Sequence, residues 1–219
     1  MNACFDWLMD WRARQLTDRL VAWVPAGSRM ADVGSGTGHN ARSFESKLGA
    51  TVDEFDVADL HWIGPGPIIF DGQKLPVADA SYDVITLLFV LQYVADGPEL
   101  LRDIGRVSAG RIIVIQSTYR GGWGRFWLTL RGLIWGRVAY RIARLAGVVK
   151  GPACSLNRRT LYTREELRQL FQVAGLRVIH FEPREWPGMR ISRDLFVLEP
   201  MDNSLTCPSS SPLETKPAG

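Results

Sequence analysis

Three glycines at alternate positions constrain the fold of this chain more than any other feature. The apolar run of residues 30–33 leads directly into GSGTG at residues 34–38, and a helix-like segment at residues 40–48 follows. Glycine accepts positive φ and lets another group approach the backbone closely. A strand, a glycine turn and a helix in this order form the first half of a parallel crossover unit. Such a turn presents backbone N–H groups to a ligand at the start of its helix.

The rest of the chain alternates strand-like and helix-like segments. The pattern predicts strands at residues 30–33, 51–57, 67–72, 81–94 and 111–117, and helices at residues 5–24, 40–48 and 96–107. The near-continuous apolar run at residues 81–94 is typical of a central parallel strand buried on both faces. This alternation predicts an α/β fold, with a mostly parallel sheet and helices on both of its faces.

The C-terminal third has a different pattern. Thr163 and Glu166 have the spacing of a capping box, which predicts a helix that runs to Gly175. Two strand-like segments at residues 177–183 and 194–200 are expected to pair as a C-terminal antiparallel hairpin. We predict one domain over residues 1–200, with residues 201–219 as a disordered tail because they are rich in Ser and Pro.

Cysteine content and hydropathy indicate the cellular compartment. The three cysteines are far apart and form no CxxC pair, so we expect neither a disulfide framework nor a zinc cluster. The longest strongly apolar run, residues 84–94, is far shorter than the roughly 20 residues that a transmembrane helix needs. We therefore predict a cytoplasmic protein.

Charge is distributed unevenly along the chain. The net charge is only +3, but residues 104–164 contain no Asp or Glu and carry twelve Arg and Lys side chains. Within this basic region, residues 118–160 combine arginines with tryptophans and leucines, and they predict an inserted helical segment after the fifth strand. We consider three interpretations of residues 120–150. They form a lid over the ligand-binding pocket, an interfacial helix on the inner, anionic face of a membrane, or a cradle for a phosphorylated or nucleic-acid substrate. The density of Trp and Leu makes nucleic acid the least favoured.

The motifs together resemble one known family. The sequence DVGSGTG at residues 32–38 is similar to the first motif of class I S-adenosylmethionine-dependent methyltransferases, in the small-molecule branch that includes the UbiE type. GATVDEFDV at residues 49–57 and the long segment at residues 75–107 resemble later motifs of that family, and residues 161–178 resume the likeness. A dinucleotide fingerprint GxGxxG would need glycine where this chain has His39. The resemblance implies a Rossmann-like, seven-stranded sheet and S-adenosyl-L-methionine as methyl donor.

The resemblance also implies which residues bind the donor. Asp32 would face its amino group, Asp56 its ribose hydroxyls, and Asp71 with Gly72 its adenine, whereas Asp53 and Glu54 are the alternatives to Asp56. The remaining donor-binding residues would be those of the glycine turn and the end of the fourth strand: Gly34, Ser35, Gly36, Gly38, Leu88 and Phe89.

The acceptor is less constrained than the donor. The chain lacks an Asn-Pro-Pro-Tyr signature, so we expect methyl transfer to oxygen or carbon of a small, hydrophobic or lipid-like acceptor. His39, Tyr93 and Tyr119 are the catalytic candidates. His61, in a loop after the second strand, is an alternative, and His180, inside an expected strand, is interpreted as structural. The candidates for contact with substrate or lid are Gln92, Trp123, Trp127, Trp135 and Tyr162. We expect no metal site. A non-catalytic subunit that binds S-adenosylmethionine is the alternative function.

Overall fold

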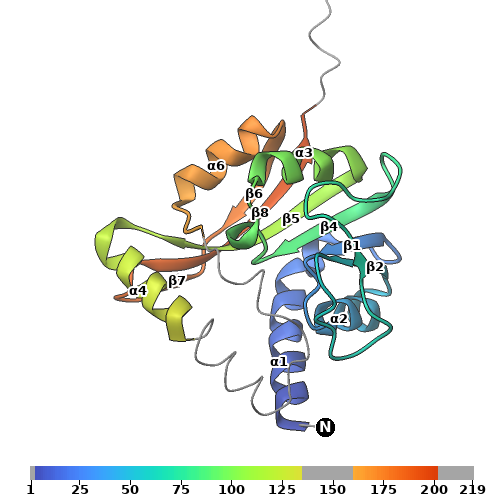
Figure 1. The fold of residues 1–219 in the computed structure, drawn as a ribbon, viewed down its shortest axis with the longest axis horizontal. Coiled ribbons are helices and arrows are strands. Elements are labelled where there is room, and N and C mark those ends of the chain that lie inside the picture. Colours follow the sequence, from blue (N-terminus) through green and yellow to red (C-terminus); the bar gives the residue numbers. More distant parts are fainter. Residues whose placement is uncertain (1–2, 135–159, 202–219) are drawn as a thin grey trace, which may run out of the picture.

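A mixed β-sheet organises the chain (Figure 1). The computed structural model describes residues 3–134 and 160–201. The sheet has eight strands, seven of which follow one another in the order β3-β2-β1-β4-β5-β8-β6, while β7 pairs with β8 alone. The strands are β1 Arg29–Val33, β2 Thr51–Asp56, β3 Ile68–Ile69, β4 Tyr82–Leu88, β5 Ser108–Tyr119, β6 Leu176–Glu182, β7 Glu185–Trp186 and β8 Ile191–Pro200.

The pairing directions confirm the predicted sheet type. Strands β3, β2, β1, β4 and β5 are mutually parallel, and β8 runs antiparallel to both β5 and β6. The register places Asp32 beside Glu54 and Val33 beside Phe55, so the turn after β1 lies level with the end of β2. Because the parallel strands end at one edge, the loops that follow β1, β2 and β4 share that edge.

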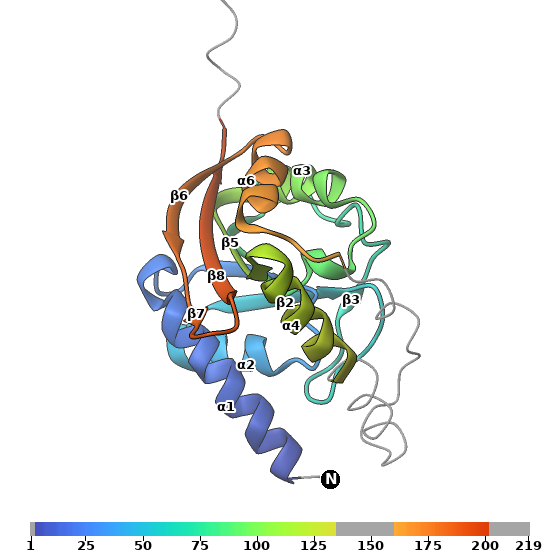
Figure 2. The same ribbon diagram turned by 90° about the vertical axis from the view of Figure 1, so that its left-hand side faces the viewer.

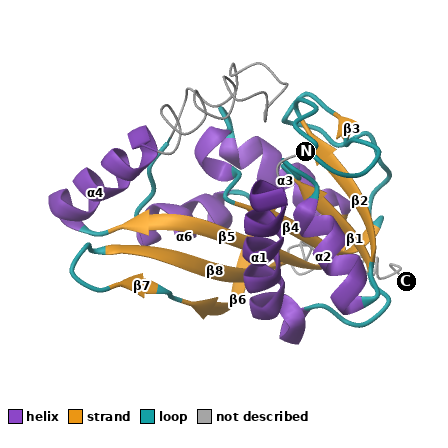
Figure 3. Cartoon of the chain, turned by 90° about the horizontal axis from the view of Figure 1, so that it is seen from below, coloured by secondary structure: helices purple, strands orange, loops and turns teal. Residues whose placement is uncertain are grey.

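Helices cover both faces of the sheet, as expected. Helices α1 Ala3–Leu20 and α2 His39–Leu48 lie on one face, and α3 Gly97–Val107 and α6 Arg164–Val173 lie on the other (Figure 3). Short 3₁₀ turns follow α1 and β4, at Val21–Trp23 and Leu91–Tyr93. Helix α4 Gly121–Leu133 follows β5 directly and lies near β7 (Figure 2).

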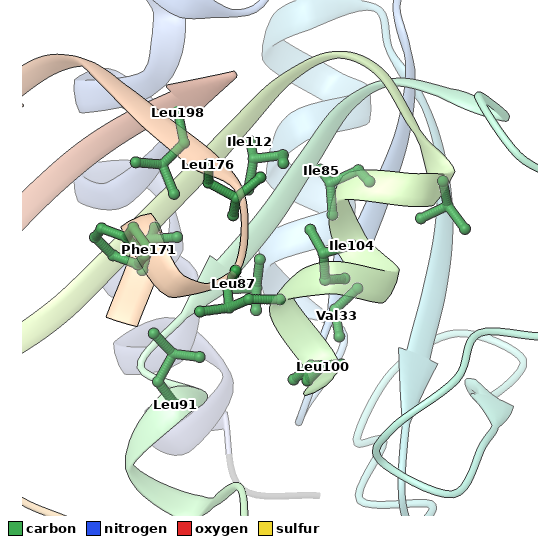
Figure 4. Packing of buried hydrophobic residues seen from close by; sticks show 14 of the residues in the cluster. Val33, Ile85, Leu87, Leu91, Leu100, Ile104, Ile112, Phe171, Leu176 and Leu198 are labelled. Atoms are coloured by element: carbon green, nitrogen blue, oxygen red, sulfur yellow. The ribbon is translucent and has the colours of Figure 1, made fainter. Parts of the chain in front are cut away.

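Two hydrophobic cores follow from this layering. On the face covered by α3 and α6, the strands contribute Val33, Leu87 and Leu198 to a cluster that includes Ile104 and Phe171 of the helices (Figure 4). A second cluster packs α1 and α2 against the other face through Leu20, Phe44 and Val197, among others. The side chains of each central strand alternate between these two clusters, which explains why most residues of these strands are apolar.

Local sequence signals set the predicted helix ends. The side chain of Asp96 accepts a hydrogen bond from the backbone N–H of Glu99, which begins α3. Thr163 and Glu166 form the predicted capping box at the start of α6. Gly49 ends α2 in the left-handed conformation that favours glycine.

Strand β4 ends earlier than its apolar sequence predicts. The expected strand reached residue 94, but Phe89 has φ +64 and the chain then turns through Leu91–Tyr93. The Nε2 atom of Gln92 donates a hydrogen bond to the carbonyl oxygen of Phe89 at 3.1 Å, which closes the turn. The chain must leave the sheet here to reach α3, so apolar residues 90 and 91 pack against the core from a loop rather than from a strand.

Some predictions fall partly outside the described residues. Helix α4 is the beginning of the predicted insertion at residues 118–160, but Trp135 and residues up to 159 lie outside the described part of the chain. Of the predicted tail, only Met201 is described, and its N–H donates to the carbonyl oxygen of Gly175 at 2.8 Å. Over residues 3–134 and 160–201, no helix has the length and apolar character to cross a bilayer.

Candidate functional site

The glycine turn after β1 is held tightly against the end of β2. Gly34, Gly36 and Gly38 have φ values of +77, +59 and +82. The N–H groups of Gly34 and Ser35 both donate to the carbonyl oxygen of Phe55, at 2.7 and 3.2 Å. A Cβ atom on Gly34 would lie 2.5 Å from Cγ2 of Val90. The turn therefore needs glycine for its conformation and for the close approach of the chain that follows β4.

Asp56 connects this turn to the end of β2. Its Oδ2 atom accepts a hydrogen bond from the N–H of Gly36 at 2.9 Å, and its Oδ1 atom accepts one from the N–H of Val57 at 2.7 Å. An ionised carboxylate has about four acceptor positions, so each oxygen can accept a further bond, such as one from a sugar hydroxyl. Asp56 is thus placed beside the glycine turn, as its predicted ribose-binding role requires.

The two alternatives to Asp56 have other partners. Asp53 is paired with Arg29 at 3.2 Å and accepts a hydrogen bond from the hydroxyl of Tyr82 at 2.9 Å. The Oε1 atom of Glu54 lies 3.3 Å from Nε2 of His61. Among the three acidic residues of β2, Asp56 is the one bonded to the glycine turn.

Asp32 is fully buried at the end of β1. The hydroxyl of Thr86 donates to its Oδ1 atom at 2.7 Å, but Oδ2 is buried without a hydrogen-bond partner among the described residues. Burial raises the pKa of Asp32 to about 6, although interactions with the side chains of Thr86 and Asn40 oppose that rise. A buried carboxylate oxygen that lacks a donor is suited to a cationic amino group, which is the predicted partner of Asp32.

Asp71 and Gly72 form an exposed turn after β3. The Oδ1 atom of Asp71 accepts hydrogen bonds from the N–H groups of Gln73 and Lys74, each at 2.8 Å, and these bonds hold the pKa of Asp71 below its usual value. Gly72 has φ +84. These contacts account for a turn-forming role, and the adenine-binding role stays a prediction.

The end of β4 supplies the remaining predicted contacts with the donor. Leu88 is buried against the α1 and α2 side, and the strained Phe89 stands at the edge of the sheet. The carbonyl oxygen of Gln92 accepts from the N–H of Thr160 at 2.8 Å, and the hydroxyl of Tyr162 reaches the carbonyl oxygen of Leu91 at 3.4 Å. Gln92 and Tyr162 therefore join the end of β4 to the segment before α6.

His39 has a structural explanation that competes with its predicted catalytic role. Its side chain is 2% exposed, and its Nδ1 and Nε2 atoms lie 2.9 Å from Oγ1 of Thr37 and Oδ1 of Asp6, respectively. The hydrogen bond from His39 lowers the pKa of Asp6. Because both ring nitrogens are engaged, the geometry favours His39 as a link between α1 and the glycine turn over His39 as a general base.

The other catalytic and acceptor candidates lie on two elements. Tyr93 belongs to the turn after β4, close enough to Arg12 for their charges to interact. Tyr119 ends β5 and lines a cavity of about 380 Å³ between α4, β7 and the start of α6. On α4, the ring of Trp123 packs with those of Phe126 and Trp127 at centroid distances of 5.8 and 5.7 Å.

The structure places further residues beside the glycine turn. His61 lies with its Nε2 atom 3.0 Å from the hydroxyl of Ser35, and the backbone N–H of Trp62 donates to the carbonyl oxygen of Thr37 at 3.2 Å. The loop between β2 and β3 thus folds over the glycine turn. Arg193 was not assigned from the sequence, because the expected strand began at Asp194 and β8 begins at Ile191. Within the described parts of the chain, no three His, Cys, Asp or Glu side chains gather as a metal site.

Fold and site together define a class of protein. A parallel sheet that ends in a glycine turn and an adjacent carboxylate, with a topological reversal between β1 and β4, is the arrangement of α/β domains that bind nucleoside-containing ligands. The turn glycines and the Oδ2 atom of Asp32 are the groups predicted to hold the amino-acid end of S-adenosylmethionine.

Comparison with known proteins identifies the family. The model of a methyltransferase domain family matches residues 8–181, and the chain belongs to that family. The ubiquinone/menaquinone biosynthesis C-methyltransferase UbiE of Ectopseudomonas mendocina is 32% identical over 116 residues, which cover 45% of this chain and 45% of that enzyme. The UbiE of Pseudomonas putida is 32% identical over 111 residues and 43% of its length. The chain thus spans less than half the length of these relatives.

Solved structures share the fold at low sequence identity. A Haloferax volcanii methyltransferase, solved in complex with the Trm112 methyltransferase activator, has a TM-score of 0.63 at 16% identity over 90% of this chain and 95% of the other. Geranyl diphosphate C-methyltransferase from Streptomyces coelicolor has a TM-score of 0.59 at 12% identity, over 86% and 78%. The chain thus belongs to the methyltransferase-domain family and has the predicted Rossmann-like fold.

Proposed function

We propose that this methyltransferase acts on an oxygen or carbon atom of a small, largely hydrophobic acceptor. The observation that carries this proposal is the position of the aromatic side chains beyond the donor turn. Phe89 lies at the end of β4, and the cluster of Trp123, Phe126 and Trp127 lies on α4, after β5. The curated relatives, which are quinone C-methyltransferases, support the same class of acceptor.

Residues of this chain would position the methyl donor and the acceptor. S-adenosylmethionine, when bound, supplies an electrophilic methyl group on a sulfonium. The glycine turn and Asp32 would hold its amino-acid end, and Asp56 would hold its ribose. An in-line displacement needs the acceptor atom in contact with the methyl group and water excluded, and alignment of this kind contributes much of the rate enhancement. Tyr93 is our candidate to remove a proton from a phenolic or acidic C–H acceptor.

We also propose that α4 and the exposed part of α1 rest on an anionic lipid surface. Trp7 and Trp11 of α1 and Trp123 and Phe126 of α4 are each more than half exposed, whereas large aromatic side chains are normally buried. Arg120 and Arg125 lie beside the α4 aromatics in the sequence. Aromatic side chains next to basic ones are typical of helices that lie in the membrane interface.

Asp56 gives a direct test of the donor site. We expect Asp56→Asn to weaken the binding of S-adenosylmethionine at least tenfold, because the amide keeps only one acceptor oxygen where two N–H groups already bind. Isothermal titration calorimetry measures the affinity. The matched control is Asp53→Asn in the same strand, which disturbs the pairing with Arg29 and Tyr82 and leaves the donor affinity within twofold.

A methyl-transfer assay distinguishes an enzyme from a non-catalytic subunit that binds S-adenosylmethionine. Labelled donor should transfer its methyl group to phenols or hydroquinones with apolar substituents, and Asp56→Asn should reduce that transfer. Equal donor affinity in the two aspartate variants would contradict the assigned site. Binding of the donor with no transfer to any acceptor, in the presence of cell extract, would favour a non-catalytic subunit instead.

A further inference from the structure

Arg193 lies in an unusual position for a basic side chain. It is on β8, directly opposite Ser117 of β5, in a strand whose neighbouring residues 194–198 are buried. The alternation of β8 places Arg193 on the same face as Leu195 and Val197, which pack toward α1 and α2. Its Nε atom is buried without a hydrogen-bond partner among the described residues. A guanidinium in this state is costly unless something else completes its hydrogen bonds.

Aromatic rings hold this guanidinium in place. Its Cζ atom lies 5.9 Å from the ring centroid of Phe89 and 5.3 Å from that of Trp186. Phe89 comes directly after β4 and Trp186 belongs to β7, so both flank the edge of the sheet where the acceptor must reach the donor. Packing between rings fixes the plane of the guanidinium and leaves its N–H edge available for a planar or tetrahedral anion.

Two further arginines share these rings. The Cζ atom of Arg12 lies 5.5 Å from the centroid of Phe89, and that of Arg131 lies 5.8 Å from the centroid of Trp186. Arg131 also donates from Nη2 to the hydroxyl of Ser117 at 2.9 Å. Helices α1 and α4 thus each bring one cation to the strand that carries Arg193. We refer to Arg12, Arg131 and Arg193 as the arginine cluster.

Two members of this cluster form no ion pair with a carboxylate in the described parts of the chain. Over the described residues, neither Arg12 nor Arg193 has an Asp or Glu within ion-pair distance, whereas the neighbouring Arg19 is paired with Glu182 at 2.9 Å. Burial, together with the charges of Arg184 and Arg19, lowers the pKa of Arg193. An anion bound at the cluster would relieve this repulsion and supply the missing acceptors.

The cluster lies beside the donor site. Arg12 interacts electrostatically with Asp32, which ends β1, and with Tyr93, which follows β4. Arg193 lies further along the sheet, two strands from β4, on the side of β5 away from the glycine turn. This separation favours an anionic group of the acceptor at Arg193 over the carboxylate of the donor.

We propose that the arginine cluster recognises a carboxylate or phosphate group of the methyl acceptor, so that the acceptor is an anion with an apolar or aromatic body. This inference rests on the proposed methyl-transfer function and specifies its substrate class. Phe89 and Trp186 would contact the apolar body, and Arg193 would bind the anionic group in bidentate fashion.

The test uses the full chain saturated with S-adenosylhomocysteine. Benzoate, phenyl phosphate and benzyl alcohol serve as probes, and the fluorescence of the tryptophans together with calorimetry reports their binding. We expect both anions to bind at least tenfold more tightly than the neutral alcohol. Arg193→Gln should remove that preference and leave the affinity for S-adenosylhomocysteine within twofold. Arg193→Lys should keep part of it, because the charge stays but the planar fork is lost.

Matched variants distinguish the outcomes. Arg177→Gln, an exposed arginine on β6, should bind all probes like the parent. If Arg193→Gln fails to fold, as judged by circular dichroism, Arg12→Gln replaces it with the same expectation for the anions. Equal binding of benzoate and benzyl alcohol, or no binding of either anion, would overturn the proposal.

The same titrations separate two further results. A parallel loss of S-adenosylhomocysteine affinity in Arg193→Gln would assign the cluster to the carboxylate of the donor, and it would also overturn the acceptor proposal. Failure of the parent protein to bind S-adenosylhomocysteine at all would instead contradict the donor-site assignment on which the proposed function rests. Failure of the acceptor proposal can therefore be distinguished from failure of the donor-site assignment.

Discussion

Gly34 is the residue whose replacement should be most harmful at the donor site. In Gly34→Ala, the new Cβ would lie 2.5 Å from Cγ2 of Val90, and the backbone would keep an unfavourable φ of +77. The left-handed conformation alone costs roughly 1 kcal/mol for alanine. The collision must also displace either the turn or the chain after β4. We expect donor affinity to fall at least tenfold by calorimetry, with a lower melting temperature.

Gly49→Ala is the matched control for Gly34. Gly49 has φ +61, but a Cβ at that position would meet nothing within 4 Å. This variant therefore carries the conformational cost without the collision, and its melting temperature should fall while its donor affinity stays unchanged. Similar donor affinities in the two alanine variants would show that the contact with Val90 is unimportant for binding.

Single residues differ in how well the sequence predicts them. The spacing of the glycines is visible in the sequence because their conformation depends on the local chain. The open oxygen of Asp32 depends on where Thr86 lies, and Thr86 is 54 positions away on another strand. Arg193 depends on pairing between β5 and β8, which no local pattern encodes. The sequence therefore predicts residues that shape a turn better than residues that meet across the sheet.

Strand β2 and the loop that follows it give the fold a pH dependence. Burial and the nearby charge of Asp32 raise the pKa of Glu54 to about 8, from an ordinary value of 4.5. The folded protein therefore holds a proton on Glu54 at pH values where the unfolded chain has lost it. Because the folded state binds more protons, the free energy of unfolding falls as pH rises from about 4.5 to 8. Asp32, raised to about 6, acts in the same direction at lower pH.

Glu54→Gln should remove most of this dependence. Glutamine resembles the protonated acid and cannot ionise, so the variant should be more stable than the parent at pH 8 and should lose less stability between pH 6 and 8. Urea denaturation at pH 5, 6 and 8 measures the effect. Glu165→Gln, on the exposed side of α6, serves as control. If the parent is equally stable at pH 6 and pH 8, Glu54 ionises normally in the folded protein.

Elements with strong local signals were predicted well. The capping box of α6 and the cap of α3 place both helix starts within a residue of the sequence prediction. The end of β4 was missed because the apolar run continues through the turn, where Leu91 is buried as deeply as a strand residue. Strand β7 was missed because two residues carry too little pattern. Apolar sequence predicts burial, and it does not by itself predict where a strand stops.

The order of the strands belongs to the whole molecule. Local patterns predict parallel strands and a terminal hairpin, but they do not place β8 between β5 and β6. The resemblance to methyltransferases supplied the expected sheet, and the structure confirms it. The position of β8 is what brings Arg193 next to Ser117 of β5.

The exposed aromatic side chains on α1 and α4 predict how the whole molecule meets a lipid surface. The N-terminal end of α1 and the C-terminal end of α4 lie on the same side of the sheet (Figures 1 and 2). We expect the protein to co-sediment with vesicles that contain phosphatidylglycerol, to bind neutral phosphatidylcholine vesicles several-fold more weakly, and to be released by 0.5 M salt, because screening weakens the attraction of its arginines to anionic lipid.

The double variant Trp123→Ser with Phe126→Ser tests which surface is responsible. Both side chains are more than half exposed, so their loss should reduce binding to anionic vesicles at least fivefold without a large change in stability. The control is Val173→Ser, an exposed apolar residue at the end of α6 on the opposite face of the sheet. If the double variant binds vesicles as the parent does, these aromatics serve the acceptor pocket, and α4 acts as a lid rather than as a membrane contact.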